Sequence, residues 1–179
     1  LTSKPWHDTS NYPFIAKLEK GIPDMKNELT FNLKERSAIF TDEQENLHVG
    51  GQWKELRLKS SGQSVFTQQA TFFPKTVQHF QECGQEFISI KISAIQPGTY
   101  IRPHTGPTNE RLRIHLTLLH TGGAKLRVGN EWRTWEEGKA IMFDDSWEHE
   151  VMHLGKDIRV VIICDIWHPE LPQSQRIIH

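Results

Sequence analysis

The chain has 179 residues, 36% of them hydrophobic and 24% charged, and its formal net charge is −1 at pH 7. This length predicts one domain, residues 1–179, that can bury a sizeable core. The near-neutral charge gives no basic patch for nucleic acid, and no apolar stretch reaches the roughly 20 residues of a membrane-spanning helix. We therefore expect a soluble domain with no nucleic-acid partner and no direct membrane insertion. The first residues, LTSKPWHDTS, do not resemble a signal peptide.

The first half of the chain is expected to hold helical and irregular segments. A short helix is predicted from Tyr12 to Glu19, and Ile22 to Gln52 is predicted to be irregular and polar. A second helix is predicted over Pro74–Cys83, because Pro74 suits a first helical turn and Gly84 can end the helix.

From Phe87 onward the pattern changes to short strands separated by turn residues. Apolar and polar residues alternate in FISIKISAI, which ends at Ile95, and in RLRIHLTLL, residues 111–119. Such alternation is typical of strands with one buried face. Further strands are predicted at Lys125–Val128, Ala140–Phe143 and Ile158–Trp167. The second half therefore predicts an all-β fold with minor helices, either a sandwich or a barrel.

Several polar side chains on these predicted strands allow two interpretations. Arg113 and His115 share the polar face of one strand, while Ser93 and Arg159 lie on other strands. The four residues belong either to a solvated outer face or to the inside of a partly open barrel. Periodicity alone does not distinguish the two.

Two histidines are candidate metal ligands. His104 and His149 follow predicted strands that end near Tyr100 and at Phe143. Neutral imidazoles at the ends of different strands could converge on one iron, zinc or copper ion. A non-haem iron oxygenase normally adds a carboxylate two residues after the first histidine, but Gly106 stands there. On spacing alone, the interpretation that neither histidine is a ligand stays open.

Charged residues close to His149 in sequence suggest an anion site. Arg159 lies ten residues later, and a turn between antiparallel strands could bring it to the same cavity, where Ser93 could add a hydroxyl group. An arginine clamps a carboxylate through two donors, although a surface ion pair is the alternative. Asp144 and Asp145 are interpreted as a turn that caps backbone N–H groups rather than as a third metal ligand.

Three long segments resemble the catalytic domain of the aspartyl/asparaginyl β-hydroxylases. They are PHTGPTNERLRIHL at 103–116, TWEEGKAIMFDDSWEHEV at 134–151 and DIWHPEL at 165–171. The resemblance is strong over Phe87–Leu171 and fainter over Asp42–Thr76. It implies a double-stranded β-helix, a cupin-like jelly roll with N-terminal helical and irregular segments, that uses Fe(II), 2-oxoglutarate and O₂.

The resemblance also implies roles for individual residues. His104 and His149 would be the metal ligands and, with Arg113, the catalytic residues. The family's iron site has no carboxylate, which agrees with Gly106. Ser93 and Arg159 would bind the distal carboxylate of 2-oxoglutarate. The full cosubstrate-binding set would be Trp53, Ser93, Arg113, Ile114, His115 and Arg159, and the substrate-binding set would be Lys91, Arg113, Glu45 and Glu55.

The activity implied is hydroxylation of the β-carbon of Asp or Asn residues in a protein or peptide substrate, in growth-factor-like domains. The location implied is the endoplasmic reticulum lumen for a eukaryotic protein and the cytoplasm for a bacterial one. His48 and Glu55 depart from the family pattern, which has a cation and an amide there, and a cysteine pair near Phe73 is missing. The substrate therefore stays open, with a lipid acyl chain as one alternative and a non-catalytic binding protein as another.

Overall fold

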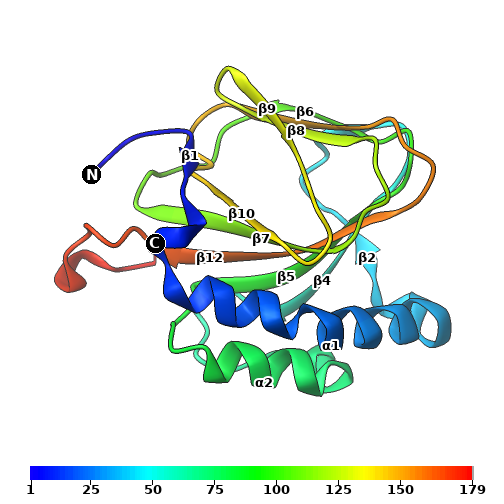
Figure 1. The fold of residues 1–179 in the computed structure, drawn as a ribbon, viewed down its shortest axis with the longest axis horizontal. Coiled ribbons are helices and arrows are strands. Elements are labelled where there is room, and N and C mark those ends of the chain that lie inside the picture. Colours follow the sequence, from blue (N-terminus) through cyan, green and yellow to red (C-terminus); the bar gives the residue numbers. More distant parts are fainter. Residues whose placement is uncertain (179) are drawn as a thin grey trace.

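A computed structural model describes residues 1–178, in which two antiparallel sheets face each other (Figure 1). The larger sheet has the order β1-β10-β7-β12-β5-β4-β2, and the smaller has the order β3-β6-β11-β8-β9. The strands of the larger sheet are β1 (Trp6–His7), β10 (Ala140–Phe143), β7 (Arg111–Leu119), β12 (Arg159–Trp167), β5 (Ser89–Ile95), β4 (Trp53–Lys59) and β2 (Thr41–Asp42). Those of the smaller sheet are β3 (His48–Val49), β6 (Tyr100–His104), β11 (His149–His153), β8 (Ala124–Val128) and β9 (Glu131–Thr134).

From β5 onward the chain passes back and forth between the sheets. Strands β5, β7, β10 and β12 form the centre of the larger sheet, while β6, β8, β9 and β11 form most of the smaller one. This alternation is the connectivity of a jelly roll. The predicted all-β jelly roll with minor helices is therefore confirmed.

The larger sheet separates two apolar cores. On β7, Leu112, Ile114 and Leu116 are fully buried against the helices, which cover the outer face of this sheet (Figure 1). Because side chains alternate along a strand, Arg113 and His115 point to the opposite face, towards the smaller sheet. The interpretation of the polar row as a solvated outer face is therefore wrong, and that row lines the space between the sheets.

The N-terminal helix is much longer than the sequence predicts. Helix α1 runs from Pro13 to Glu35, through the segment expected to be irregular, and contains Pro23. Its buried residues recur every three or four positions and form one apolar face against the larger sheet: Ile15, Leu18, Ile22, Met25 and Leu29. Burial of this face outweighs the unfavourable helix propensities of glycine and proline.

Helix α2, Pro74–Glu82, agrees with the predicted second helix and packs against α1. The contact is close at Gly21, where an added Cβ would lie 2.6 Å from Cγ of the His79 ring. His79 Nε2 is in turn held by Asp24 Oδ2 at 2.8 Å. The small size of Gly21 thus allows the two helices to approach.

We expect Gly21→Ala to lower the free energy of unfolding by about 1 kcal/mol. Overpacking costs about 1–3 kcal/mol, whereas alanine recovers about 1 kcal/mol of helix propensity. Urea unfolding measures the difference. In a His79→Ala background the clash is absent, so the same substitution should instead be neutral or stabilising. A loss of equal size in both backgrounds would contradict the close contact as its cause.

Both candidate metal ligands lie inside strands rather than in the loops after them. His104 is the last residue of β6, and His149 is the first residue of β11, a strand that the sequence analysis did not predict. In β11 the buried positions are His149, Val151 and His153. Two of these three are histidines, which hid the strand's apolar face from pattern analysis.

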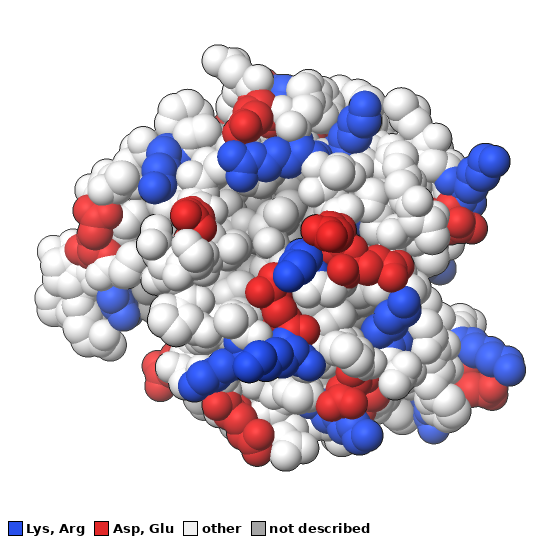
Figure 2. Space-filling model, in the orientation of Figure 1, with Lys and Arg blue, Asp and Glu red and all other residues white. Residues whose placement is uncertain are grey.

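The charges of the molecule are interspersed rather than segregated. Figure 2 shows lysine, arginine and acidic side chains alternating around a hollow of mostly uncharged atoms on one face. Within residues 1–178, no helix is both long enough and apolar enough to cross a membrane.

Candidate metal and anion site

A narrow cavity lies between the two sheets and is lined by residues from β4, β5, β6, β7, β8, β10, β11 and β12. It contains both candidate metal ligands and most of the other predicted site residues. Apolar side chains such as Phe143, Leu126 and Ile163 fill the space between them. The cavity is small, with about 50 Å³ of free volume.

His104 and His149 are brought together by strand pairing. They are direct partners in the β6–β11 register, and their ring centroids are 4.1 Å apart. Each Nδ1 lies within hydrogen-bond distance of a backbone carbonyl two residues earlier, at 2.7 Å from Arg102 O and at 2.8 Å from Trp147 O. These carbonyls accept hydrogen bonds from protonated Nδ1 atoms, which leaves both Nε2 lone pairs available to a metal ion.

Burial keeps one of the two imidazoles uncharged. It lowers the pKa of His149 to about 4, so the ring is neutral at pH 7 and can act as a ligand. Gly106, by contrast, leaves no room for a third ligand, because a Cβ there would lie 2.5 Å from Asp145 Oδ2. No cluster of three or more metal-binding side chains occurs in residues 1–178. The residues present therefore fit a metal held by two histidines.

Arg159 forms the other end of the cavity. It is 2% exposed, and its Nη2 donates to Ser93 O at 3.1 Å and to Ser93 Oγ at 3.2 Å. The guanidinium also lies over the Trp135 ring, and Trp53 Nε1 donates to the same Ser93 hydroxyl at 3.0 Å. Three predicted cosubstrate residues, Arg159, Ser93 and Trp53, thus form one connected group. Trp135 joins this group through its contact with Arg159.

No carboxylate in the described part of the chain pairs with Arg159, and its Nε has no hydrogen-bond partner there. Burial lowers the pKa of Arg159 to about 9, as expected for a buried charge without a partner. A buried unpaired cation is costly, and an anion entering the cavity would offset that cost. Arg159 therefore fits the distal carboxylate of a dianionic ligand.

His115 is held as a neutral hydrogen-bond donor. Trp135 Nε1 donates to His115 Nδ1 at 3.1 Å, so Nε2 carries the ring proton. Burial and the nearby Arg159 lower the pKa of His115 well below its usual value. The sequence analysis did not assign Trp135 to the site, although it lies within the matching segment at 134–151.

Arg113 is fixed by carboxylates that the sequence analysis did not identify as its partners. Its Nε and Nη2 donate to Asp165 Oδ1 and Oδ2 at 2.9 and 3.0 Å, and Asp145 Oδ2 lies 3.6 Å from Nη1. Burial opposes the charge, but Asp165 and Asp145 raise the pKa of Arg113 above its usual range. Asp144 accepts from Ser146 N at 2.9 Å, as the predicted turn requires.

Only some of the predicted substrate residues line the cavity. Lys91 and Glu45 line the cavity, whereas Glu55 is buried behind Lys91 and does not line it. Ile114 needs a correction as a cosubstrate-binding residue, because its side chain lies in the core on the helix side of the sheet. Because β7 borders the cavity, only the backbone of Ile114 could contact a cosubstrate there.

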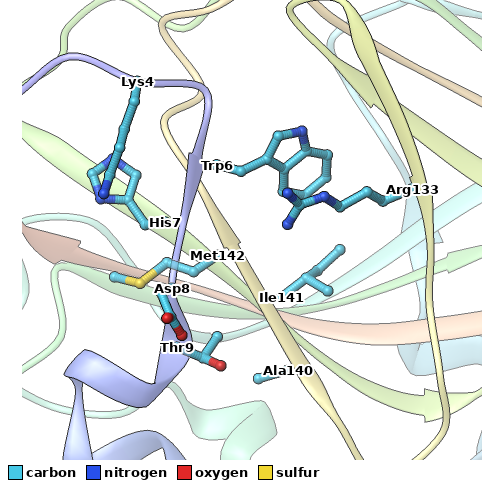
Figure 3. Close-up of a pocket in the computed structure, with 9 residues that line it drawn as sticks. All are labelled: Lys4, Trp6, His7, Asp8, Thr9, Arg133, Ala140, Ile141 and Met142. Carbon is cyan, nitrogen blue, oxygen red and sulfur yellow. The ribbon is translucent and has the colours of Figure 1, made fainter.

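A larger cavity, of about 390 Å³, lies elsewhere, between the N-terminal segment, β9 and β10 (Figure 3). Its cations are Lys4 and Arg133, and the guanidinium of Arg133 lies 4.3 Å from the Trp6 ring centroid. It shares no lining residue with the cavity of His104 and His149. The smaller cavity is therefore the candidate functional site, because it combines two adjacent imidazoles that could bind a metal with a buried arginine that could bind an anion.

The fold and this cavity define a jelly-roll protein of the double-stranded β-helix class with a two-histidine site. The chain belongs to the aspartyl/asparaginyl β-hydroxylase family, whose model matches residues 19–169. The mouse aspartyl/asparaginyl β-hydroxylase is 39% identical over 98% of this chain and 25% of its own length, and the human protein is 38% identical over 98% and 24%. The chain thus spans about a quarter of these relatives.

Two other proteins resemble the chain more distantly. The ornithine lipid ester-linked acyl 2-hydroxylase of Rhizobium tropici is 28% identical over 94% of this chain and 62% of its own length. A Pseudomonas putida prolyl-4-hydroxylase structure superposes with a TM-score of 0.55, at 12% identity, over 83% of this chain and 87% of that one. The structural likeness concerns the fold alone.

Proposed function

We propose that the protein is an Fe(II)- and 2-oxoglutarate-dependent hydroxylase that acts on the β-carbon of Asp or Asn residues in a protein substrate. The observation that carries the proposal is the unpaired, buried Arg159 in the same cavity as the free Nε2 atoms of His104 and His149. The two imidazoles would suit a metal ion, and Arg159 would suit a carboxylate of the cosubstrate. Family membership supports the same activity.

The chain's own residues would divide the work. His104 and His149 would hold Fe(II), which when bound supplies the activation of O₂ coupled to decarboxylation of 2-oxoglutarate to succinate. Arg159 and Ser93 would bind the distal carboxylate and so orient the cosubstrate. The neutral His115 would donate a hydrogen bond from its Nε2–H to a cosubstrate oxygen, and the apolar lining would exclude water.

The test is mass spectrometry of peptides incubated with the protein, Fe(II), 2-oxoglutarate and O₂, with succinate followed in parallel. Cyclic growth-factor-like peptides with Asp or Asn are compared with matched Ala peptides. The proposal predicts a gain of one oxygen on the Asp or Asn peptides only. Succinate without peptide oxidation would contradict the protein substrate, and absence of both products would contradict the activity.

A second candidate is hydroxylation of a lipid acyl chain by the same chemistry. The observation in its favour is the likeness to the Rhizobium tropici acyl 2-hydroxylase over nearly the whole of this chain. Adding lipid acyl substrates to the same assay separates the two candidates. Oxygen gained by the lipid and not by any peptide would replace the first proposal with the second.

A further inference from the structure

The outer half of the cavity is rich in carboxyl groups, and the two cations expected to bind an acidic substrate there, Lys91 and Arg113, are both paired within the protein. Lys91 lines the cavity, but its Nζ lies 3.3 Å from Glu55 Oε2 and 3.5 Å from Glu43 Oε2. Both carboxylates are nearly inaccessible to water, with side chains 8% and 2% exposed. Lys91 is therefore already paired twice within the protein.

The local fold fixes this arrangement. Glu55 lies on β4 and Lys91 on the neighbouring strand β5. Glu43 follows β2 and is tied to β4 by its backbone N–H, which donates to Trp53 O at 2.9 Å. Because the backbones of all three residues are held at the sheet, the carboxyl groups of Glu43 and Glu55 are kept beside Lys91.

The protonation of Glu55 does not change this conclusion. Burial and the adjacent Glu43 raise the pKa of Glu55, whereas Lys91 and Glu55 together hold the pKa of Glu43 below its usual value against the effect of burial. If Glu55 is ionised, the cluster has a net charge of about −1; if it is protonated, Glu43 still neutralises Lys91. In neither state is Lys91 a free cation.

Arg113, the second cation of the outer half, is neutralised in the same way by Asp165 and Asp145. The exposed Glu45 adds a carboxylate to the lining. Two cations therefore lie beside five carboxyl groups, of which Glu45 lines the cavity and the other four are buried next to it: Glu43, Glu55, Asp145 and Asp165. At the inner end the balance is opposite, because the cation Arg159 is unpaired.

We infer that Glu55, through Lys91, makes this cavity select a carboxamide over a carboxylate on the substrate, so that Asn is the preferred target and Asp is disfavoured. This inference rests on the proposed function and narrows its substrate. A substrate carboxylate has acceptors only and would enter a region of like charge. A carboxamide is uncharged, can accept from Arg113 and can donate its N–H groups to the surrounding carboxylates. Glu55 is a positioning residue here, since it acts through Lys91.

The decisive experiment is a competition between two peptides that differ only in Asn or Asp at one position. Both are mixed at equal concentration with the protein, Fe(II), 2-oxoglutarate and O₂, and mass spectrometry at low conversion gives the ratio of their kcat/KM values. The native chain should oxidise the Asn peptide in preference. At a pH high enough to ionise Glu55, whose pKa is raised by burial and by Glu43, Glu55→Gln removes one charged partner of Lys91. Under those conditions it should shift the ratio towards Asp by about tenfold, the effect of one charge-assisted hydrogen bond.

Two further variants control this result. Glu82→Gln removes a carboxylate from exposed α2, on the far side of the sheet, and should leave the ratio at the native value. Glu43→Gln removes the other partner of Lys91 and should shift the ratio in the same direction as Glu55→Gln, so it carries the test if the Glu55 variant does not fold. A native preference for Asp, or an unchanged ratio in a folded Glu55→Gln or Glu43→Gln variant, would overturn the inference.

Binding separates this inference from the proposed activity. Fluorescence anisotropy with the two labelled peptides gives Kd values that do not depend on turnover. Tighter binding of the Asn peptide, reversed in Glu55→Gln, would support the selectivity even if neither peptide were oxidised, in which case only the activity would be contradicted. Equal binding of the two peptides, or binding of neither, would overturn the selectivity.

Discussion

His149→Ala should abolish iron-dependent turnover and reduce metal affinity by well over 100-fold, while the protein stays folded. Losing a group that merely supports a ligand costs about 10–100-fold in affinity, and here one of only two histidine ligands is removed. Titration with Fe(II) under anaerobic conditions, or with Mn²⁺ as an inert substitute, measures the affinity independently of activity. Circular dichroism checks the fold.

His153→Ala is a suitable comparison for this variant, because His153 lies on the same strand but does not line the cavity. Its Nε2 bonds Asp157 O, so its replacement should affect stability rather than metal binding. Full metal affinity or full activity in His149→Ala would remove the metal assignment.

Arg159→Met should raise the concentration of 2-oxoglutarate required by about 10- to 150-fold, because a charge-assisted contact contributes about 1.5–3 kcal/mol. The same variant should be more stable than the native chain when 2-oxoglutarate is absent. Its buried cation has no counter-charge, and replacing a buried charge by an apolar side chain of similar size stabilises by up to about 4 kcal/mol.

Thermal unfolding with and without 2-oxoglutarate tests both effects. The Tm of the native protein should rise as the cosubstrate is added, because a ligand that binds only the folded state stabilises it. The Tm of Arg159→Met should start higher and rise little. Arg159→Lys keeps the charge without the planar fork and should fall between the two. An Arg159→Met variant with native 2-oxoglutarate dependence would exclude Arg159 as the carboxylate partner.

The two ends of the cavity differ in charge, and this difference affects both the cosubstrate and the substrate of the proposed reaction. At the inner end, the positive charge of Arg159 is not neutralised by a carboxylate. At the outer end, the positive charge of Lys91 is neutralised by its carboxyl partners. Under the proposed function, a dianionic cosubstrate would be directed inward. The side chain to be hydroxylated would then meet the end rich in carboxyl groups, where its charge would affect how well it binds.

Part of this protein was determined by its sequence alone. Strict alternation in the segments at 87–95 and 111–119 predicted two central strands, because the period of a strand is visible without its neighbours. The long motifs around His104 and His149 predicted the family, and Pro74 and Gly84 predicted the bounds of α2 to within one residue.

Other features depended on contacts between residues far apart in the chain. The length of α1 follows from burial against the sheet and from the fit of Gly21 to His79, which no local propensity encodes. Strand β11 is recognisable only from its pairing with β6 and β8, since histidines occupy two of its three buried positions. Local pattern analysis fails where tertiary packing supplies the stabilising energy.

The same distinction holds for the site. The residue type and position of Arg159 suggested carboxylate binding, whereas Lys91 and Glu55 were singled out as substrate residues through the resemblance to the family. Only the tertiary structure decided that Arg159 is unpaired and that Lys91 is enclosed by Glu55 and the unpredicted Glu43. The availability of a charge depends on its partners and its burial, and both are properties of the folded chain rather than of the residue.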